Sequence, residues 1–375
     1  MREESPKRIL LIGATGYAGR RLDKYLLTST DATVILSGRD RTKLSDLQSS
    51  LPTLDLSRRT ELLELDAADI DVAALTDFDL LVNATGTGRH NASMIQACLE
   101  RRADWIDMQM TNELLNPPTE LRAKIERAGC RFVIQAGFHP GILAALVRHA
   151  AQQMDTIHSA IVGSAIRDEG GVPFTSGATE LVESFRDYKG EMYKDGRWQK
   201  LGYADYPMVE LEYGFGELRA YPVEMPELRR LPELLPGLKN TGFFVAGFNW
   251  VADYLVTPLI MLSSKVAPRQ SVSWLGHLLT WSTRTFARAP YGTVVQVDAE
   301  GQCDDRPAQL RLSMFHEDAY VLTAIPTVAM IKQMLQDELQ PGIHLMGLCC
   351  DPVQLLSDIE RMGISITRRL ETIGV

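Results

Sequence analysis

A glycine-rich turn near the start of the chain restricts its fold more than any other feature. An apolar run over 8–12 precedes this turn, an amphipathic helix is expected over 17–27, and a second apolar run, 32–36, follows at once. This order predicts a β-α-β unit, in which two parallel strands are joined by a helix that covers one face of the sheet. The turn itself consists of Gly13, Ala14, Thr15, Gly16, Tyr17, Ala18 and Gly19.

The alternation of short apolar runs and helical patterns continues to about residue 137. We expect further strands over 60–65, 78–83, 105–108 and 131–135, and helices over 70–75, 93–101 and 118–128. Six strands alternating with helices predict a doubly wound parallel sheet of the Rossmann type. We assign this domain to residues 1–142.

The pattern changes from about residue 145 onward. A hairpin is expected around Asp195-Gly196, and period-2 runs over 292–301, 308–318 and 319–325 predict strands of an antiparallel sheet. Helices are expected over 327–340 and 352–362. The sequence therefore predicts an α/β protein with a second, α+β domain over 143–335, used for substrate binding or dimerisation. Helices within 336–375 are expected to return to the first domain.

Charge and composition indicate a globular protein. The chain has 375 residues, 45% of them hydrophobic and 23% charged, and its formal net charge is -9. No block of basic residues forms the stripe that nucleic-acid binding requires, so we expect no nucleic-acid partner.

The five cysteines are irregularly spaced and include no C-x-x-C pair, so we predict neither a disulfide framework nor a metal site. The first residues lack the apolar core of a signal peptide. Both observations favour the cytoplasm.

The segment 243–262 is the most apolar part of the chain. Asn249, Asp253 and Pro258 interrupt it, so a membrane-spanning helix is not expected. We favour a buried or interface helix, which would fit a homodimer, and keep peripheral membrane or lipid contact as the alternative.

Glycines at 13, 16 and 19 have a specific use in a strand-turn-helix context. They permit a tight turn, let backbone N–H groups approach a pyrophosphate, and let the helix pack closely on the strand. The sequence therefore predicts dinucleotide binding, with a structural turn as the alternative.

The end of the second strand indicates which nicotinamide cofactor binds. NAD-specific sites place an acidic residue there for the ribose 2′-hydroxyl. This chain has Ser37, Gly38 and Arg39, with Lys43 close behind. A guanidinium can hold a 2′-phosphate through two hydrogen bonds, so we predict NADP; a solvated basic loop is the alternative.

Two further strand ends face the same crevice. Asp66 could accept from the adenine amino group or cap the next short helix. The segment Asn83, Ala84, Thr85 and Gly86 has small residues past which the cofactor could run, or it forms only a tight turn.

The segments GATGYAGR, LSGRDRTKL, DLLVNATG, ACLERRADWIDM and AGFHPGI, in this order and spacing, resemble the saccharopine dehydrogenase-like oxidoreductases. The resemblance is strong over the first 145 residues, and the C-terminal tail is also similar. It implies an NADP-preferring Rossmann domain, an inserted α/β domain, and final helices that return to the first domain. Members of the family reduce or oxidise a secondary amine formed between an amino acid or polyamine and a carbonyl compound.

The chain departs from the common family pattern at two places. Many members have Gly-Pro after the fourth strand, where this chain has Thr85-Gly86, and Gly-Glu after the Asp of the fifth strand, where it has Met108-Gln109. Both places are near the expected nicotinamide, so imine reduction is less firmly implied than the fold and the cofactor.

Hydride transfer needs few protein groups, because the cofactor carries the chemistry and the protein orients the substrate and manages one proton. Candidates for the proton are Asp107 after the fifth strand, His139 in the turn after the sixth, and His316 and Tyr320 in the second domain. Turn, hairpin or core roles would also explain them. A glycine-rich lid is expected over 168–183, where Ser176, Thr179 and Glu180 would cap a helix.

Three functions are compatible with these features. The first is an NADP-dependent oxidoreductase acting on the C–N bond of a small substrate. The second is a reductase of C=C or C=O bonds in a lipid-like or polyketide-like substrate, and the third is a cofactor-binding protein that has lost catalysis.

Overall fold

The computed structural model describes residues 6–86, 88–110, 113–167, 169, 189–249, 251–260, 272–336 and 339–372. The chain forms two compact units. Unit 1 consists of Met1–Ile142 and Tyr320–Gly363, and unit 2 of Leu143–Ala319 and Ile364–Val375. The predicted lid over 168–183 lies outside the described residues, apart from Glu169.

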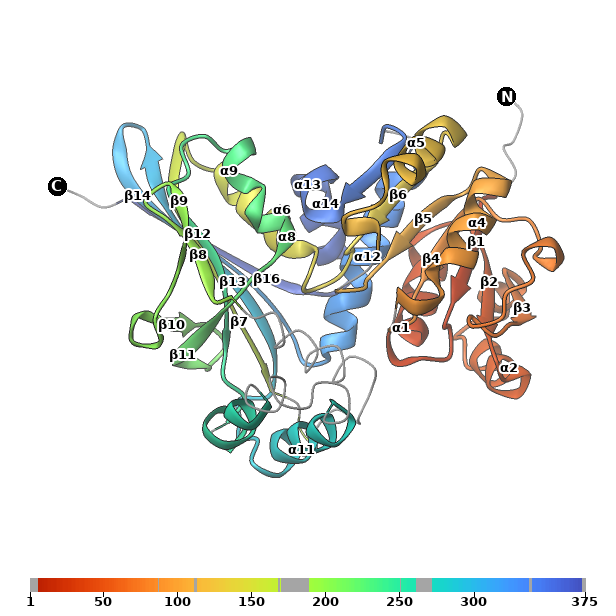
Figure 1. The fold of residues 1–375 in the computed structure, drawn as a ribbon, viewed down its shortest axis with the longest axis horizontal. Coiled ribbons are helices and arrows are strands. Elements are labelled where there is room, and N and C mark those ends of the chain that lie inside the picture. Colours follow the sequence, from red (N-terminus) through yellow and green to blue (C-terminus); the bar gives the residue numbers. More distant parts are fainter. Residues whose placement is uncertain are drawn as a thin grey trace. The chain divides into compact units, whose positions relative to one another are not determined.

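Unit 1 contains a seven-stranded sheet whose neighbouring strands are all parallel (Figure 1). The strand order is β15-β6-β5-β4-β1-β2-β3, which is the doubly wound order that the sequence predicted, extended by one strand. Its strands are β1 Arg8–Ile12, β2 Thr33–Gly38, β3 Thr60–Glu64, β4 Leu80–Asn83, β5 Asp104–Asp107, β6 Arg131–Ile134 and β15 Gly342–Leu345.

The central strands are continuous apolar runs because helices cover both faces of a parallel sheet. Leu10 and Leu81 are fully buried, and Trp105 stacks on Phe132 with ring centroids 5.9 Å apart. The helices of unit 1 are α1 Tyr17–Ser29, α2 Arg41–Ser49, α3 Leu54–Arg58, η1 Val72–Ala74, η2 Gly88–His90, α4 Asn91–Arg101, η3 Glu113–Leu115, α5 Thr119–Ala128, α12 Ala319–Leu335, α13 Met346–Cys349 and α14 Pro352–Arg361.

Several helix ends follow from local sequence. Asp40 caps α2 by accepting from the Lys43 amide, and Asp351 caps α14 in front of Pro352. Gly129 ends α5 in the left-handed conformation that glycine adopts without strain.

The strand predicted over 319–325 is wrong, because these residues begin helix α12. Almost every side chain of α12 from Val321 to Met334 is buried, so the helix shows little of the 3.6-residue periodicity that marks an amphipathic helix. A short apolar run with β-branched residues cannot then be told from a strand.

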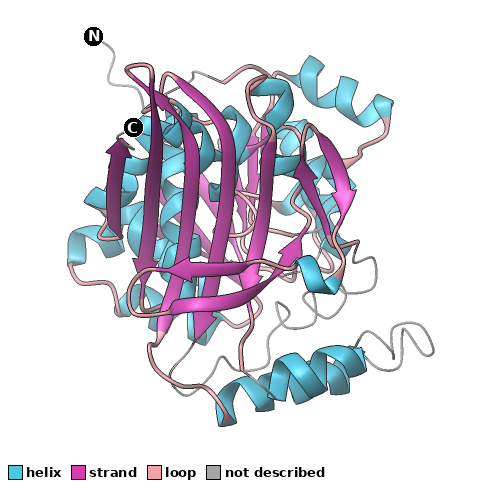
Figure 2. Cartoon of the chain, turned by 90° about the vertical axis from the view of Figure 1, so that its left-hand side faces the viewer, coloured by secondary structure: helices cyan, strands magenta, loops and turns pink. Residues whose placement is uncertain are grey.

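Unit 2 contains a second, mixed sheet, seen face-on in Figure 2. Its path is β10-β11-β12-β7-β13-β14-β16, with the hairpin β8–β9 attached to β12. The β12–β7 pair is parallel, which differs from the purely antiparallel sheet that the sequence predicted. The strands are β7 Thr156–Arg167, β8 Glu191–Lys194, β9 Arg197–Lys200, β10 Met208–Leu211, β11 Gly216–Val223, β12 Asn240–Ala246, β13 Gly292–Cys303, β14 Arg306–His316 and β16 Ser365–Thr372.

The helix expected over the apolar segment 243–262 is wrong. Its first residues belong to β12, where Phe243 and Phe244 are buried, and only 251–260 are helical among its described residues. The remaining helices of unit 2 are α6 Ile142–Ala151, η5 Tyr203–Asp205, α8 Pro226–Arg229, α9 Leu231–Leu234, η6 Ala252–Val256 and α11 Val272–Thr285. Within the parts of the chain that the structure describes, no helix has the length and apolarity to cross a membrane.

The return of the chain to the first unit differs in its bounds from the expectation. The sequence placed it at 336–375, whereas in the structure it begins at Tyr320. The last strand, β16, pairs antiparallel with β14 and so lies in unit 2. Helix α12 belongs with unit 1 because it packs on the turn after β6, where the Thr327 hydroxyl donates to the Ala136 carbonyl.

Candidate functional site

The glycine turn after β1 has no room for side chains at two positions. A Cβ atom at Gly19 would lie 2.1 Å from the Gly13 carbonyl oxygen, far inside contact distance. Gly13 has φ +84°, and a Cβ there would lie 3.1 Å from the Ala84 carbonyl oxygen. The turn is therefore pressed against both the following helix and the end of β4.

The backbone of this turn is arranged as a cradle at the start of α1. Gly16 is the N-cap residue of α1 and has no side chain to satisfy the amides of the first turn. The Gly16 amide donates to Gly13 and the Ala14 amide to the Ser37 carbonyl. The remaining N–H groups of the helix start can bind an anion, and the helix dipole favours negative charge there.

The end of β2 lies beside this turn. The Ala14–Ser37 hydrogen bond joins the two strand ends, and a Cβ at Gly38 would lie 3.4 Å from the Thr15 hydroxyl oxygen. The Ser37 side chain is buried, and its hydroxyl has no hydrogen-bond partner within the described part of the chain.

Arg39 is exposed, and no described residue forms an ion pair with it. Lys43 differs, because its ammonium lies 3.5 Å from the Asp40 carboxylate. Arg39 is thus the cation at this strand end that can reach a ligand without breaking a described ion pair.

Asp66 follows β3 and caps a turn. Its carboxylate accepts from the Ala68 amide at 3.0 Å. Asp66 does not cap the next short helix, η1, because Asp71 is the N-cap residue there. One carboxylate oxygen of Asp66 can still accept from a ligand.

A chain of buried amide side chains links the ends of β4 and β5. The Asn83 amide donates to Asn91 at 3.0 Å, and Asn91 donates to Gln109 at 2.9 Å. Gln109 donates in turn to the Thr85 carbonyl, while the Asn83 carbonyl oxygen accepts from the amide and hydroxyl of Thr85. The loop from Asn83 to Thr85 is therefore held from both sides by neutral groups.

Asp107 is buried and its carboxylate is engaged by three groups that the structure describes. Trp105 Nε1 donates to one oxygen at 2.7 Å, and the amides of Gln109 and Gln135 donate to the other. Such a carboxylate positions the ends of β5 and β6, and it is poorly placed to exchange a proton with a substrate.

The turn after β6 is under backbone strain. Gln135 has φ +57°, which is unusual for a non-glycine residue, and it is buried. Its side-chain NH2 group donates to the Met110 carbonyl at 2.7 Å, whereas its side-chain oxygen, Oε1, has no partner among the described residues. Gly141 must be glycine, because a Cβ there would lie 2.4 Å from the backbone carbonyl oxygen of Gln135.

His139 lies in the same turn, with its ring 3.7 Å from the ring of Phe138 by centroids. Desolvation by burial lowers the pKa of His139 to about 3. The imidazole is therefore neutral at physiological pH and can form hydrogen bonds, but it does not act there as a cationic acid.

Two tyrosines singled out in the sequence are brought together. Tyr17 and Tyr320 stack with ring centroids 5.3 Å apart and planes at 21°, and the Arg21 guanidinium lies 6.0 Å from the Tyr320 ring. Tyr17 directly follows the N-cap of α1, so Tyr320 lies at the start of the helix that the glycine turn opens. The turn containing His139 is also close to α12, because a Cβ at Gly137 would lie 3.2 Å from Thr323.

His316 is in unit 2, not in unit 1 with the other candidates. Its Nδ1 accepts from the Asp318 amide at 2.8 Å, which closes the turn after β14. The turn that the sequence allowed is present, but it leads into helix α12 and does not form a hairpin.

Three residues of this region were missed by sequence reasoning, namely Asn91, Gln109 and Gln135. The substitution of Gln109 at the family's usual Gly-Glu segment was noticed, but nothing in the local pattern indicated that it bonds to Asn91. Gln135 and Gln109 directly follow the ends of β6 and β5, by one and two residues, and this position was their local signal. Asn91, at the start of α4, has no such signal.

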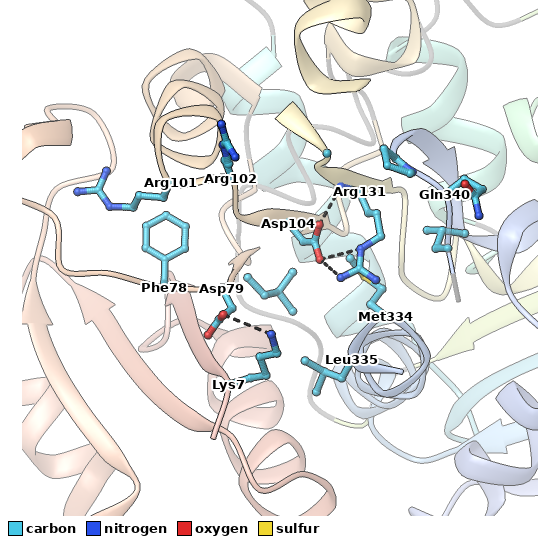
Figure 3. A pocket seen from close by; sticks show the side chains of 14 residues that line it. Lys7, Phe78, Asp79, Arg101, Arg102, Asp104, Arg131, Met334, Leu335 and Gln340 are labelled. Carbon is cyan, nitrogen blue, oxygen red and sulfur yellow. Dashed lines mark hydrogen bonds and ion pairs between the residues drawn. The ribbon is translucent and has the colours of Figure 1, made fainter. Parts of the chain in front are cut away.

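A cavity of about 410 Å³ lies at the opposite, amino edge of the sheet (Figure 3). Lys7 and Asp79 lie 3.5 Å apart there, and Arg131 forms two hydrogen bonds with the carboxylate of Asp104. Arg101 donates to the Leu75 carbonyl at 2.6 Å. Two of the four basic residues that line the cavity, Lys7 and Arg131, are paired with its two acidic residues. Open parallel sheets, however, bind cofactors at the carboxyl edge. We therefore do not assign the cofactor to this cavity.

Two further features concern metals and cysteines. In the described ranges, no group of three His, Cys, Asp or Glu side chains is arranged to hold a metal ion. None of the five cysteines, all of which lie in those ranges, forms a disulfide.

Comparisons with known proteins agree with this geometry. Residues 9–133 match the family model described as the saccharopine dehydrogenase NADP binding domain. The chain is also similar to apo saccharopine dehydrogenase (L-Glu forming) from Saccharomyces cerevisiae, with a TM-score of 0.69, 13% identity, and coverage of 97% of this chain and 100% of the other. The predicted fold class is confirmed by this likeness and by the two sheets.

Two curated relatives are carboxynorspermidine synthases. The Vibrio alginolyticus protein is 24% identical over 225 residues, which cover 55% of this chain and 53% of the relative. The Vibrio cholerae protein is 26% identical over 215 residues, covering 52% and 50%. The chain thus spans about half the length of the curated relatives it matches.

Proposed function

We propose that this chain, whose unit 1 contains an NADP-binding domain of the saccharopine dehydrogenase type, is an oxidoreductase that transfers a hydride to or from a carbon–nitrogen bond. The glycine turn carries the proposal. A Cβ atom at Gly13 or Gly19 would crowd the backbone of this turn, which lies at the start of a helix and beside an exposed arginine. This is the arrangement that a dinucleotide with a 2′-phosphate requires.

The described residues fit NADP at each of its charged groups. The amides at the start of α1 would hold the pyrophosphate, and Arg39 would hold the 2′-phosphate in a bidentate contact. The strand end of Asn83 to Thr85, fixed by Asn91 and Gln109, would support the ribose and nicotinamide half. Asp66 would accept from the adenine amino group.

NADP, when bound, supplies or accepts the hydride. In the reducing direction the carbon of a C=N bond gains the hydride and the nitrogen gains a proton. The chain must therefore exclude water, orient the substrate and hold one proton. We assign the proton to the hydroxyl of Tyr320, which is fixed by its stack on Tyr17 beside the helix start. His139, being neutral, would act as a hydrogen-bond partner of the substrate.

Gln135 is a further candidate substrate contact. Its buried side-chain oxygen, Oε1, has no described partner, and its backbone is held at positive φ by the turn around it. Strain of this kind persists where the surroundings fix a functional geometry. A carbonyl oxygen placed in this way suits an ammonium or amide N–H donor.

The C–N substrate class is supported by the curated relatives, which are carboxynorspermidine synthases, and by the fold shared with a saccharopine dehydrogenase. The test is the oxidation of NADPH, followed by absorbance, with mixtures of an amino acid or polyamine and a carbonyl compound. Turnover that requires both components would support the proposal, and turnover with either component alone would contradict it.

A reductase of C=C or C=O bonds in a lipid-like substrate is the second candidate, favoured by the exposed apolar side chains of η6 and α11. Turnover of enoyl or carbonyl compounds without any amine would identify it. Tight NADPH binding without turnover of either class would instead indicate a cofactor-binding protein without catalysis. We retain the cytoplasm and a homodimer as proposals that follow from the sequence.

A further inference from the structure

An exposed aromatic face lies on a pair of helices in unit 2. Helix α11 and the helical segment 251–260 pack on each other through their own apolar cluster, which includes Val256, Ile260, Leu275 and Leu279. Figure 1 shows α11 beyond the ends of the strands of this unit. With one side of each helix buried in that cluster, the opposite side is available for another contact.

Large, partly exposed apolar side chains lie beside the buried side. On α11, Trp274 is 47% and Trp281 is 49% exposed, and their spacing of seven residues places both on one face. On the neighbouring segment, Leu255 is 58% and Leu259 is 37% exposed, four residues apart. These four residues are called the tryptophan face below. Tryptophan is large, so two that are half exposed on one helix are unusual in a protein that has no partner there.

The charge of this part of the chain is opposite to that of the whole. Residues 251–297 contain four basic residues and one acidic residue, Asp253, whose carboxylate accepts from the Phe248 amide, although the formal net charge of the chain is -9. Two of the four, Arg284 and Arg288, are described, and both are exposed. Arg284 follows Trp281 by three residues, so it lies at the end of the same helical face.

We propose that the tryptophan face binds the surface of a membrane containing anionic lipids. Amphipathic helices that lie in the interface combine Trp and Leu on one side with basic residues at its border, and tryptophan is enriched at the level of the headgroups. Each basic residue close to an anionic surface adds attraction. The helices lie on the membrane without crossing it.

A second copy of this chain fits the same face less well. A two-fold interface brings each surface patch against itself. The net positive charge of residues 251–297 would then approach its own equivalent. An anionic lipid surface supplies the negative charge that a second copy lacks.

The test is co-sedimentation of the full chain with vesicles of phosphatidylcholine, with and without phosphatidylglycerol. We expect binding only to the anionic vesicles, weakened by salt. Replacing both tryptophans, Trp274→Ser with Trp281→Ser, should lower the partition constant more than tenfold. The pair Arg284→Gln with Arg288→Gln should lower it about fivefold for each charge removed.

Leu54→Ser is the matched control, because Leu54 is 80% exposed but lies on α3 of unit 1. It should bind vesicles like the unchanged protein. Circular dichroism melting shows whether each variant folds, and the arginine pair tests the proposal on its own if the tryptophan variant does not fold.

Three results would overturn the proposal. The unchanged protein could fail to bind either kind of vesicle, or the folded tryptophan variant could bind anionic vesicles as well as the unchanged protein. The third result would be a dimer in sedimentation velocity that is lost in the tryptophan variant. The tryptophan face would then bind a second copy of the chain. None of these results depends on hydride transfer, so the proposed function can stand or fail separately.

Discussion

The rings of Tyr17 and Tyr320 stack with centroids 5.3 Å apart, although the residues come from opposite ends of the chain. Tyr17 stands at the start of the helix that the glycine turn opens, and Tyr320 at the start of α12. The contact therefore connects the predicted cofactor site with the part of the chain that returns to unit 1. It also places a second hydroxyl beside that site.

Tyr320→Phe tests the assignment of the proton. The ring and its stack are kept, so the affinity for NADPH should change little, while kcat should fall by about 10²–10⁴-fold because the proton-transferring hydroxyl is lost. Steady-state kinetics combined with a binding titration separate the two effects. Tyr17→Phe is the matched variant and should retain most of kcat; a large loss in Tyr17→Phe with full activity in Tyr320→Phe would reverse the assignment.

Arg39→Ala tests the contact with the 2′-phosphate. A charge-assisted hydrogen bond contributes about 1.5–3 kcal/mol, so the Kd for NADPH should rise about 10- to 150-fold while that for NADH stays nearly constant. Arg41→Ala removes an exposed cation two residues away, at the start of α2, and should have a small effect on both. Equal weakening of NADPH and NADH in Arg39→Ala would remove the argument for this residue.

Asn91→Ala tests the buried amide chain. The change leaves the Asn83 side-chain NH2 group and the Gln109 side-chain oxygen without their partner in Asn91, which should lower the free energy of unfolding by about 1–3 kcal/mol and weaken NADPH binding. Denaturant titration and calorimetry measure these effects. Gln96→Ala, on the exposed side of the same helix, should leave both unchanged. An Asn91 variant as stable as the Gln96 variant would show that the amide chain does not fix the loop.

Asp23 makes stability depend on pH. It is buried in α1, its carboxylate has no partner among the described residues, and burial raises its pKa from 3.8 to about 7. The folded state therefore holds this proton more tightly than the unfolded state. The resulting stability is fully present below about pH 4 and is lost as the pH rises to about 7.

Asp23→Asn removes this titration. Between pH 4 and 8 the unchanged protein should lose about 2–4 kcal/mol more of its free energy of unfolding than the variant does. Urea titrations at several pH values give both slopes. Parallel pH profiles for the two proteins would mean that the Asp23 carboxylate is solvated or paired in the folded state.

The first six strands of unit 1 could be predicted from the sequence because each is a short apolar run between turn or helix signals. The run 8–12 coincides with β1, and Gly129 ended the helix before β6 as expected. Strand β15 was not predicted, because its four residues pair with β6 across a sequence separation that no local pattern records.

The errors have a common physical cause. Helix α12 and strand β12 are both buried in the middle of their units, so neither shows the polar side that distinguishes the two periodicities. For the candidate site, by contrast, the glycine turn and Arg39 could be recognised from local sequence. The contacts of Tyr320 with Tyr17 and of Asn91 with Gln109 depend on tertiary packing and could not.

The glycine turn and Arg39 together form the proposed NADP site. The most direct measurement is a calorimetric titration of the purified chain with NADPH and, separately, with NADH. We predict saturable binding of NADPH with one site per chain and much weaker binding of NADH. Failure of both dinucleotides to bind, or tighter binding of NADH, would contradict the account.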